Sequence, residues 1–158
     1  LVNMAINKQP LFAGTIRMTT KTFNPPIIND NYLTYNGTWS TAPQLVYTAA
    51  GTYGDIIDRI TISATGDLTF TTVTAKLIYI YLYDIGTDSF SLYKTLKMPA
   101  ATISATTPNP ELELVFTGGL LLKLDDQIYI GASDNSTNSG QKGDYISVTI
   151  EGGTYDQQ

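Results

Sequence analysis

From Gln44 onward, short β-rich runs alternate with turn residues, and this alternation limits the fold of the chain more than any other feature. In the run Asp55–Ala64, the apolar residues Ile60, Ile62 and Ala64 alternate with polar ones. Successive side chains of a strand point to opposite faces, so this spacing predicts a half-buried β-strand. No segment shows the period of an amphipathic helix. The sequence therefore predicts an all-β protein.

Runs of the same character recur along the rest of the chain, and most are bounded by Gly, Asn, Asp or Pro. We expect strands over 44–49, 55–64, 68–73, 74–84, 89–97, 111–116, 120–124, 127–132 and 145–151. Residues 85–88 predict a hairpin loop, Gly118-Gly119 predicts a turn, and Gly152-Gly153 is expected to end the last strand. The proline-containing stretch 98–110 predicts a crossover between sheets. Together these features predict a two-sheet antiparallel β-sandwich, a jelly roll or a related Greek key.

The run 74–84 is apolar on both faces, which is typical of a central strand. One face carries Tyr79, Tyr81 and Tyr83, and tyrosine is abundant in protein interfaces. We expect these three side chains to lie under a neighbouring molecule.

Residues 1–43 have a different composition, with four prolines and one strand expected over 11–20. We interpret 1–43 as an extended N-terminal arm and 44–158 as the sandwich domain. Several apolar side chains of the arm would be costly to leave in water. With the three tyrosines, they form the predicted assembly interface: Leu11, Phe12, Ile16, Phe23, Ile27 and Ile28. The arm either folds back on its own domain or docks on a neighbouring subunit.

Charged residues make up only 15% of the 158 residues, and the net charge is −5. Nine basic residues spread along the chain do not predict a nucleic-acid surface. The longest apolar run, 77–82, is too short to cross a bilayer, and the N-terminal residues lack the pattern of a signal peptide. We expect no nucleic-acid partner and no membrane association.

The chain contains neither Cys nor His, which removes thiol nucleophiles, common zinc sites and His-based triads. We expect no catalytic residues, no cofactor and no bound metal. If the protein were an enzyme, Glu111, Glu113 and Glu151 would be the first carboxylates to consider. Paired glutamates on one strand are more typical of a charged outer face.

Two weaker alternatives concern the loops. Oxygen ligands for calcium could come from Asp125, Asp126, Asp134, Asn135, Asn138 and Asp144, although they match no EF-hand spacing. A sugar could be bound by the loop 133–144 with Trp39. Asn36-Gly37-Thr38 and Asn135-Ser136-Thr137 match the glycosylation sequon, but Asn-Gly is also a favoured turn pair.

A family resemblance appears in the order of landmarks along nearly the whole chain. The landmarks are 4–12, 58–66, 75–84, 93–94, 118–120, 127–133 and 150–155. In this order the chain resembles a group of small tailed-phage proteins of unassigned role that end in a Gly-Gly-Asp-Tyr-like signature. It departs from them with Thr154 in place of Asp and with three residues added at the end.

This resemblance implies a virion component, such as a capsid decoration or head-fibre protein, and carries no catalytic residues. The partners would be the major capsid protein or other virion proteins. The protein would be assembled in the host cytoplasm and located on the particle surface. We also expect a homo-oligomer, by analogy a trimer. A carbohydrate-binding or adhesion module and a subunit of an extracellular filament are the alternatives.

Overall fold

The structure is a computed structural model, and it describes residues 13–28, 42–66, 71–133 and 145–155. Ten strands and no helix are found within these ranges. The strands are β1 (Ala13–Phe23), β2 (Gln44–Thr48), β3 (Asp55–Ala64), β4 (Thr72–Val73), β5 (Lys76–Asp84), β6 (Ser89–Met98), β7 (Ala101–Thr102), β8 (Glu111–Leu122), β9 (Gln127–Ala132) and β10 (Ile146–Tyr155). No described segment is therefore a membrane-spanning helix.

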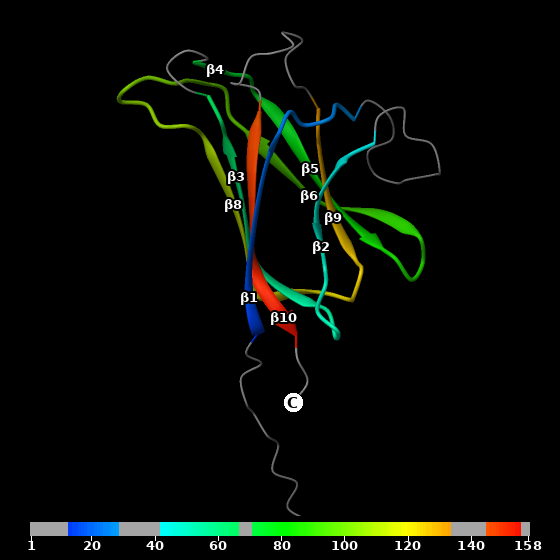
Figure 1. Ribbon diagram of the computed structural model, residues 1–158. Coiled ribbons are helices and arrows are strands. Elements are labelled where there is room, and N and C mark those ends of the chain that lie inside the picture. Colours follow the sequence, from blue (N-terminus) through cyan, green and yellow to red (C-terminus); the bar gives the residue numbers. More distant parts are fainter. Residues whose placement is uncertain (1–12, 29–41, 67–70, 134–144, 156–158) are drawn as a thin grey trace, which may run out of the picture.

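Two four-stranded antiparallel sheets form the body of the protein (Figure 1). The first, sheet A, has the order β1-β10-β3-β8, and the second, sheet B, has the order β2-β9-β5-β6. Apart from the short β4–β7 ribbon, eight long strands remain, and they pair from the ends of the chain inward. β1 pairs with β10, β2 with β9 and β3 with β8, while β5 and β6 form a hairpin. This is the order of a jelly roll, so the predicted β-sandwich is confirmed.

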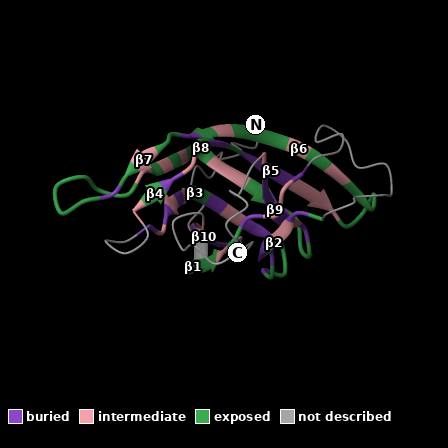
Figure 2. Ribbon diagram, turned by 90° about the horizontal axis from the view of Figure 1, so that it is seen from above, coloured by how far each residue is buried: buried purple, intermediate pink, exposed green. Residues whose placement is uncertain are grey.

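The core lies between the two sheets and consists of buried apolar residues from both. Figure 2 marks the buried positions along the strands in purple. On β3 these include Ile60, Ile62 and Ala64, as expected, and each has at most 2% of its surface exposed. Alternate apolar residues of β10 and β8 pack on the same core, namely Ile146, Val148 and Ile150 of β10 and Leu112, Leu114 and Phe116 of β8. Alternation in the sequence therefore located the buried face of sheet A correctly.

Two predicted breaks are wrong. Gly118-Gly119 does not separate two strands, because β8 continues through both glycines with an irregularity in its pairing to β3. Likewise, β10 runs through Gly152-Gly153 to Tyr155. At Gly152 a Cβ atom would lie 2.1 Å from the Ile56 carbonyl oxygen, so this glycine permits close contact between β10 and β3.

Part of the expected N-terminal arm belongs to the sandwich. Residues Ala13–Phe23 form β1, the edge strand of sheet A, and pair with β10 from Tyr155 to Ile146. The predicted strand 11–20 is thus present with shifted bounds. Residues 1–12 and 29–41, which hold Leu11, Phe12 and Trp39, lie outside the described residues.

The tyrosine face of β5 is covered by the chain itself. Pro26 and Ile28 pair with Ala132 at the end of β9 through two backbone hydrogen bonds of 2.9 Å. Ile28 then packs with Tyr79 and Tyr81, which are 4% and 1% exposed. These two tyrosines are therefore buried in the single chain and present almost no surface to a neighbour.

Candidate functional site: the outer face of sheet A

The solvent-facing side of sheet A, here called the outer face, combines charged, hydroxyl and apolar side chains from all four strands. The register places Met18 opposite Glu151, Glu151 opposite Arg59, and Arg59 opposite Val115. Neighbouring side chains on one face of an antiparallel sheet are close enough to interact. Four strands that are distant in sequence thus contribute to one continuous surface.

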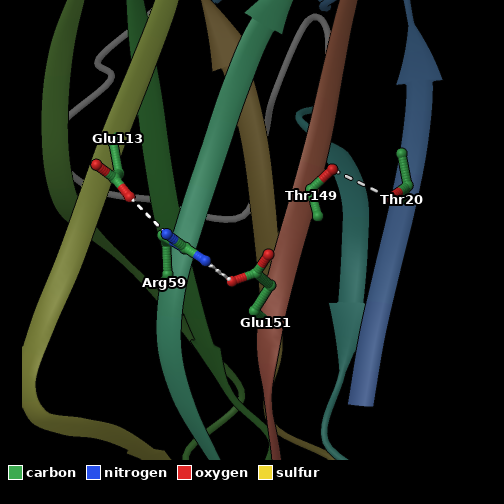
Figure 3. A network of polar contacts seen from close by, with 5 residues as sticks. All are labelled: Thr20, Arg59, Glu113, Thr149 and Glu151. Carbon is green, nitrogen blue, oxygen red and sulfur yellow. Dashed lines mark hydrogen bonds and ion pairs between the residues drawn. The ribbon is translucent and has the colours of Figure 1, made fainter.

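Arg59 is the centre of a polar network on this face (Figure 3). Its Nε donates a hydrogen bond of 2.7 Å to Glu151 Oε2, and a second guanidinium nitrogen contacts the same oxygen. Its Nη1 donates to Glu113 Oε1 at 2.9 Å. The hydrogen bonds that Arg59 donates to Glu113 and Glu151 raise its pKa above the usual value. The guanidinium therefore stays charged and fixes two glutamates from β8 and β10.

Hydroxyl pairs lie beside this network. Thr20 of β1 and Thr149 of β10 are hydrogen-bonded at 3.0 Å, as Figure 3 shows. On the other side, Ser63 donates to Glu111 at 2.8 Å. The polar groups of the face are thus bonded across adjacent strands and hold the surface in one shape.

Apolar side chains project into solvent around these polar groups. Ile16 is 87% exposed, Met18 70%, Leu121 63% and Val115 62%. Together with Asp58, Arg59 and Glu151, three of them line a shallow groove of about 480 Å³. Exposed apolar side chains gathered with polar neighbours mark contact surfaces in many proteins.

The three glutamates that sequence analysis singled out for chemistry are all on this face, as their outward positions indicated. The structure brings Glu113 and Glu151 together on Arg59, whereas Glu111 bonds to Ser63. Glycoside hydrolysis uses two carboxylates that flank the scissile bond. Here the two carboxylates that meet are bridged by a guanidinium, an arrangement suited to holding a surface rather than to transferring a proton.

The predicted interface residues fall into three separate places. Ile16 is on the outer face, whereas Phe23 packs against the core and Ile28 against Tyr79 and Tyr81. Ile27 forms a parallel bridge with Ala132. Tyr83 packs with Phe90 and Tyr129, at ring-centroid distances of 4.7 and 6.3 Å. Leu11 and Phe12 lie outside the described residues.

Sequence reasoning missed Arg59, Met18 and Val115 as members of the candidate surface. A signal existed, because Val115 follows Glu111 and Glu113 at alternate positions of one strand and therefore shares their outward face, where an apolar residue is unusual. The position of Met18 carried no comparable signal, since the pairing of β1 with β10 joins segments more than a hundred residues apart.

The loop acids have structural roles where they are described. The Asp126 carboxylate accepts hydrogen bonds from the backbone N–H groups of Lys123 and Ile85, at 2.9 and 3.3 Å. The described residues contain no group of acidic side chains that could hold a metal ion. Asp125 is exposed and has a positive φ of 68°. The remaining predicted calcium ligands, both sequons and nearly all of the loop 133–144 lie outside the described residues.

Comparison with models of known protein families found no match to this chain, and comparison with curated proteins found no relative.

Proposed function

We propose that this chain is a structural protein of a phage particle, a capsid decoration or head-fibre subunit that works by binding its neighbours. The observation that carries the proposal is the outer face of sheet A, where exposed Ile16, Met18 and Val115 surround the Arg59 network. A rigid, partly apolar surface gains free energy when a second protein covers it. The carboxylates of Glu111, Glu113 and Glu151 are already bonded within the face.

The fold and the resemblance support the proposal by analogy. Jelly rolls form viral capsid and lectin domains, but a fold alone does not determine a function. The phage-like landmarks of the sequence favour the capsid reading over the lectin reading. The partners on this view are the major capsid protein or other virion proteins, and the protein resides on the particle surface after assembly in the host cytoplasm.

Quantitative mass spectrometry of purified phage particles whose genome encodes this chain tests the proposal. We expect a copy number comparable with that of the major capsid protein for a decoration subunit, or a few copies per particle for a fibre subunit. Complete absence from particles, with the protein present in the infected lysate, would contradict the proposal.

A truncation shows whether the protein attaches to the particle through its first residues or through the outer face of sheet A. Removal of residues 1–12 leaves β1 intact, whereas removal of 1–20 would also delete most of this strand and its pairing with β10. If the first residues anchor the protein, the 1–12 truncation folds but is lost from particles. If the outer face anchors it, the truncation is incorporated normally, and Met18→Asp or Val115→Asp is lost instead.

A further inference from the structure

Two lysines of β6 stand out because they have no acidic partner among the described residues. Lys94 and Lys97 are exposed and take part in no ion pair there. The other described basic side chains have partners. Arg59 binds two glutamates, Lys123 lies 3.8 Å from Asp84, and Lys21 donates to the Leu45 carbonyl. Arg17 is close enough to Tyr47 to act on the pKa of that hydroxyl, and Lys76 is buried.

The same strand is an edge of sheet B and carries no acidic residue. Beside the lysines, Tyr93 is 41% exposed, and Leu77, which pairs with Lys97 across β5 and β6, is 39% exposed. Edge strands often carry lysine, which prevents uncontrolled pairing with other strands. Lys97 lies on the outer side of sheet B with Leu77, whereas Lys94 is opposite the core residue Ile80 and so lies on the other side of the strand. The β6 edge thus presents one lysine on each of its two sides, each with an apolar or aromatic neighbour.

The outer face of sheet A has the opposite charge. It carries the carboxylates of Asp58, Glu111, Glu113 and Glu151 against the guanidinium of Arg59. Asp58 is exposed and bonds to no described side chain. The excess negative charge of the outer face lies among the exposed side chains of Ile16, Met18 and Val115.

We propose that the outer face of sheet A binds the β6 edge of a second copy of this chain. Lys94 and Lys97 of one copy would approach Asp58 and the glutamates of the other, while Tyr93 and Leu77 would cover the exposed apolar side chains. The long stems of lysine also cover apolar surface while the ammonium groups reach the carboxylates. The contact places opposite charges together and removes apolar surface from water.

Such a contact joins two different surfaces, so an open assembly always has a free face at one end and a free edge at the other. Contacts of this kind produce a ring when the rotation closes and an open filament when it does not. Face-to-face pairing of two copies would bring like charges together, which disfavours that arrangement. The inference rests on the proposed assembly function and specifies one contact within it.

Sedimentation velocity of the purified full-length protein over a concentration series tests the contact. We expect concentration-dependent association of the unaltered protein. Two charge-reversed variants should each associate at least about tenfold more weakly, which corresponds to about 1.4 kcal/mol. One is Lys94→Glu with Lys97→Glu. The other is Asp58→Lys with Glu111→Lys, which leaves the two glutamates of Arg59 unchanged.

Combining the variants distinguishes the contact from general charge effects. A chain with all four substitutions should regain association, because the charges are exchanged. An equimolar mixture of the two double variants should also regain association, in alternating order, since each surface of one variant is opposite in charge to the surface it would contact on the other. Lys123→Glu, at the exposed lysine that follows β8 and pairs at 3.8 Å with Asp84, is the control for charge reversal outside the two surfaces and should associate normally. Circular dichroism and thermal melts establish that each variant is folded.

Several outcomes would overturn the inference. These are a monomer at every concentration, normal association of the Lys94→Glu/Lys97→Glu variant, or no recovery in the fourfold variant. Weakening by the face substitutions alone would indicate face-to-face pairing instead. These measurements use purified protein alone. A result that contradicts the contact therefore does not contradict the proposed function, which the copy number in particles tests separately.

Discussion

The hydroxyl of Tyr47 donates a hydrogen bond of 2.7 Å to the carboxylate of Asp55, which has no exposed surface. The same carboxylate accepts hydrogen bonds of 3.0 Å from the backbone N–H groups of Ala50 and Gly51. One buried acid thus ties β2, the following turn and β3 together. A buried charge of this kind is tolerated because hydrogen-bond donors surround it.

Replacing this acid should destabilise the sandwich. Asp55→Asn keeps the size of the side chain but puts an amide group where hydrogen-bond donors converge, so we expect a loss of about 2 kcal/mol or more. Asp88→Asn is the matched control, because Asp88 also accepts from a tyrosine, Tyr83, at 2.6 Å but is exposed. Urea unfolding should show a change within about 0.5 kcal/mol for the control. Equal losses in the two variants would contradict a special role for Asp55.

The same pair predicts a dependence of stability on alkaline pH. Burial first, and then the hydrogen bond to Asp55, raise the pKa of Tyr47 well above its usual value. The unfolded chain releases this proton near pH 10 while the folded chain keeps it, so the stabilisation is complete below about pH 10 and is lost as the pH rises further. The expected slope from this one group is about 1.4 kcal/mol per pH unit.

The prediction is tested by comparing the stability of Tyr47→Phe, which lacks the titrating group, with that of the unaltered protein at several pH values. At about pH 8 we expect this variant to be less stable by about 1–2 kcal/mol, because the carboxylate loses a donor. Between about pH 10 and about pH 11 the difference from the unaltered protein should shrink. A constant difference across this range, measured by urea unfolding, would show that Tyr47 does not cause the alkaline loss.

Gly152 should be intolerant of any side chain. A Cβ atom there would lie 2.1 Å from the Ile56 carbonyl oxygen and 2.9 Å from the Ile57 Cα, so the backbones of β10 and β3 would have to separate. We expect Gly152→Ala to lower the free energy of unfolding by about 2–3 kcal/mol. Gly118→Ala is the contrast, because its Cβ would meet no atom within 4 Å and only its positive φ of 85° opposes the change. Its cost should be about 1 kcal/mol.

Ile28 should hold the segment that covers the tyrosine face of β5. Its side chain packs with Tyr79 and Tyr81 and leaves no space for a Cβ on Gly131. Ile28→Ala should cost about 2 kcal/mol or more and increase quenching of tyrosine fluorescence by acrylamide. Ile16→Ala, at an isoleucine that is 87% exposed, should change the stability by less than about 0.5 kcal/mol. Unchanged quenching in Ile28→Ala would show that other contacts keep the segment in place.

The fold class could be predicted from the sequence because it depends on local patterns. Alternation at Ile60, Ile62 and Ala64 shows the buried face of a strand whatever its partners are, since the period of a strand is two. The apolar character of both faces of 74–84 likewise indicated a central strand, and the structure pairs β5 on both sides. Outward positions for Glu111 and Glu113 followed from the same reasoning.

The tertiary structure alone decided which strands are neighbours, and therefore what the outer face contains. Glu151 meets Arg59 across a sequence separation of 92 residues, and no local pattern specifies that distance. The two glycine pairs were wrongly predicted for a related reason, because each resembles a break between strands. Gly118-Gly119 lies where the pairing of β8 with β3 is irregular, and Gly152 lies where β10 and β3 approach closely. The sequence by itself determined the strands and their buried sides. Strand pairing, which depends on contacts distant in sequence, determined the Arg59 network, the cover over the tyrosines and the exposed apolar groove.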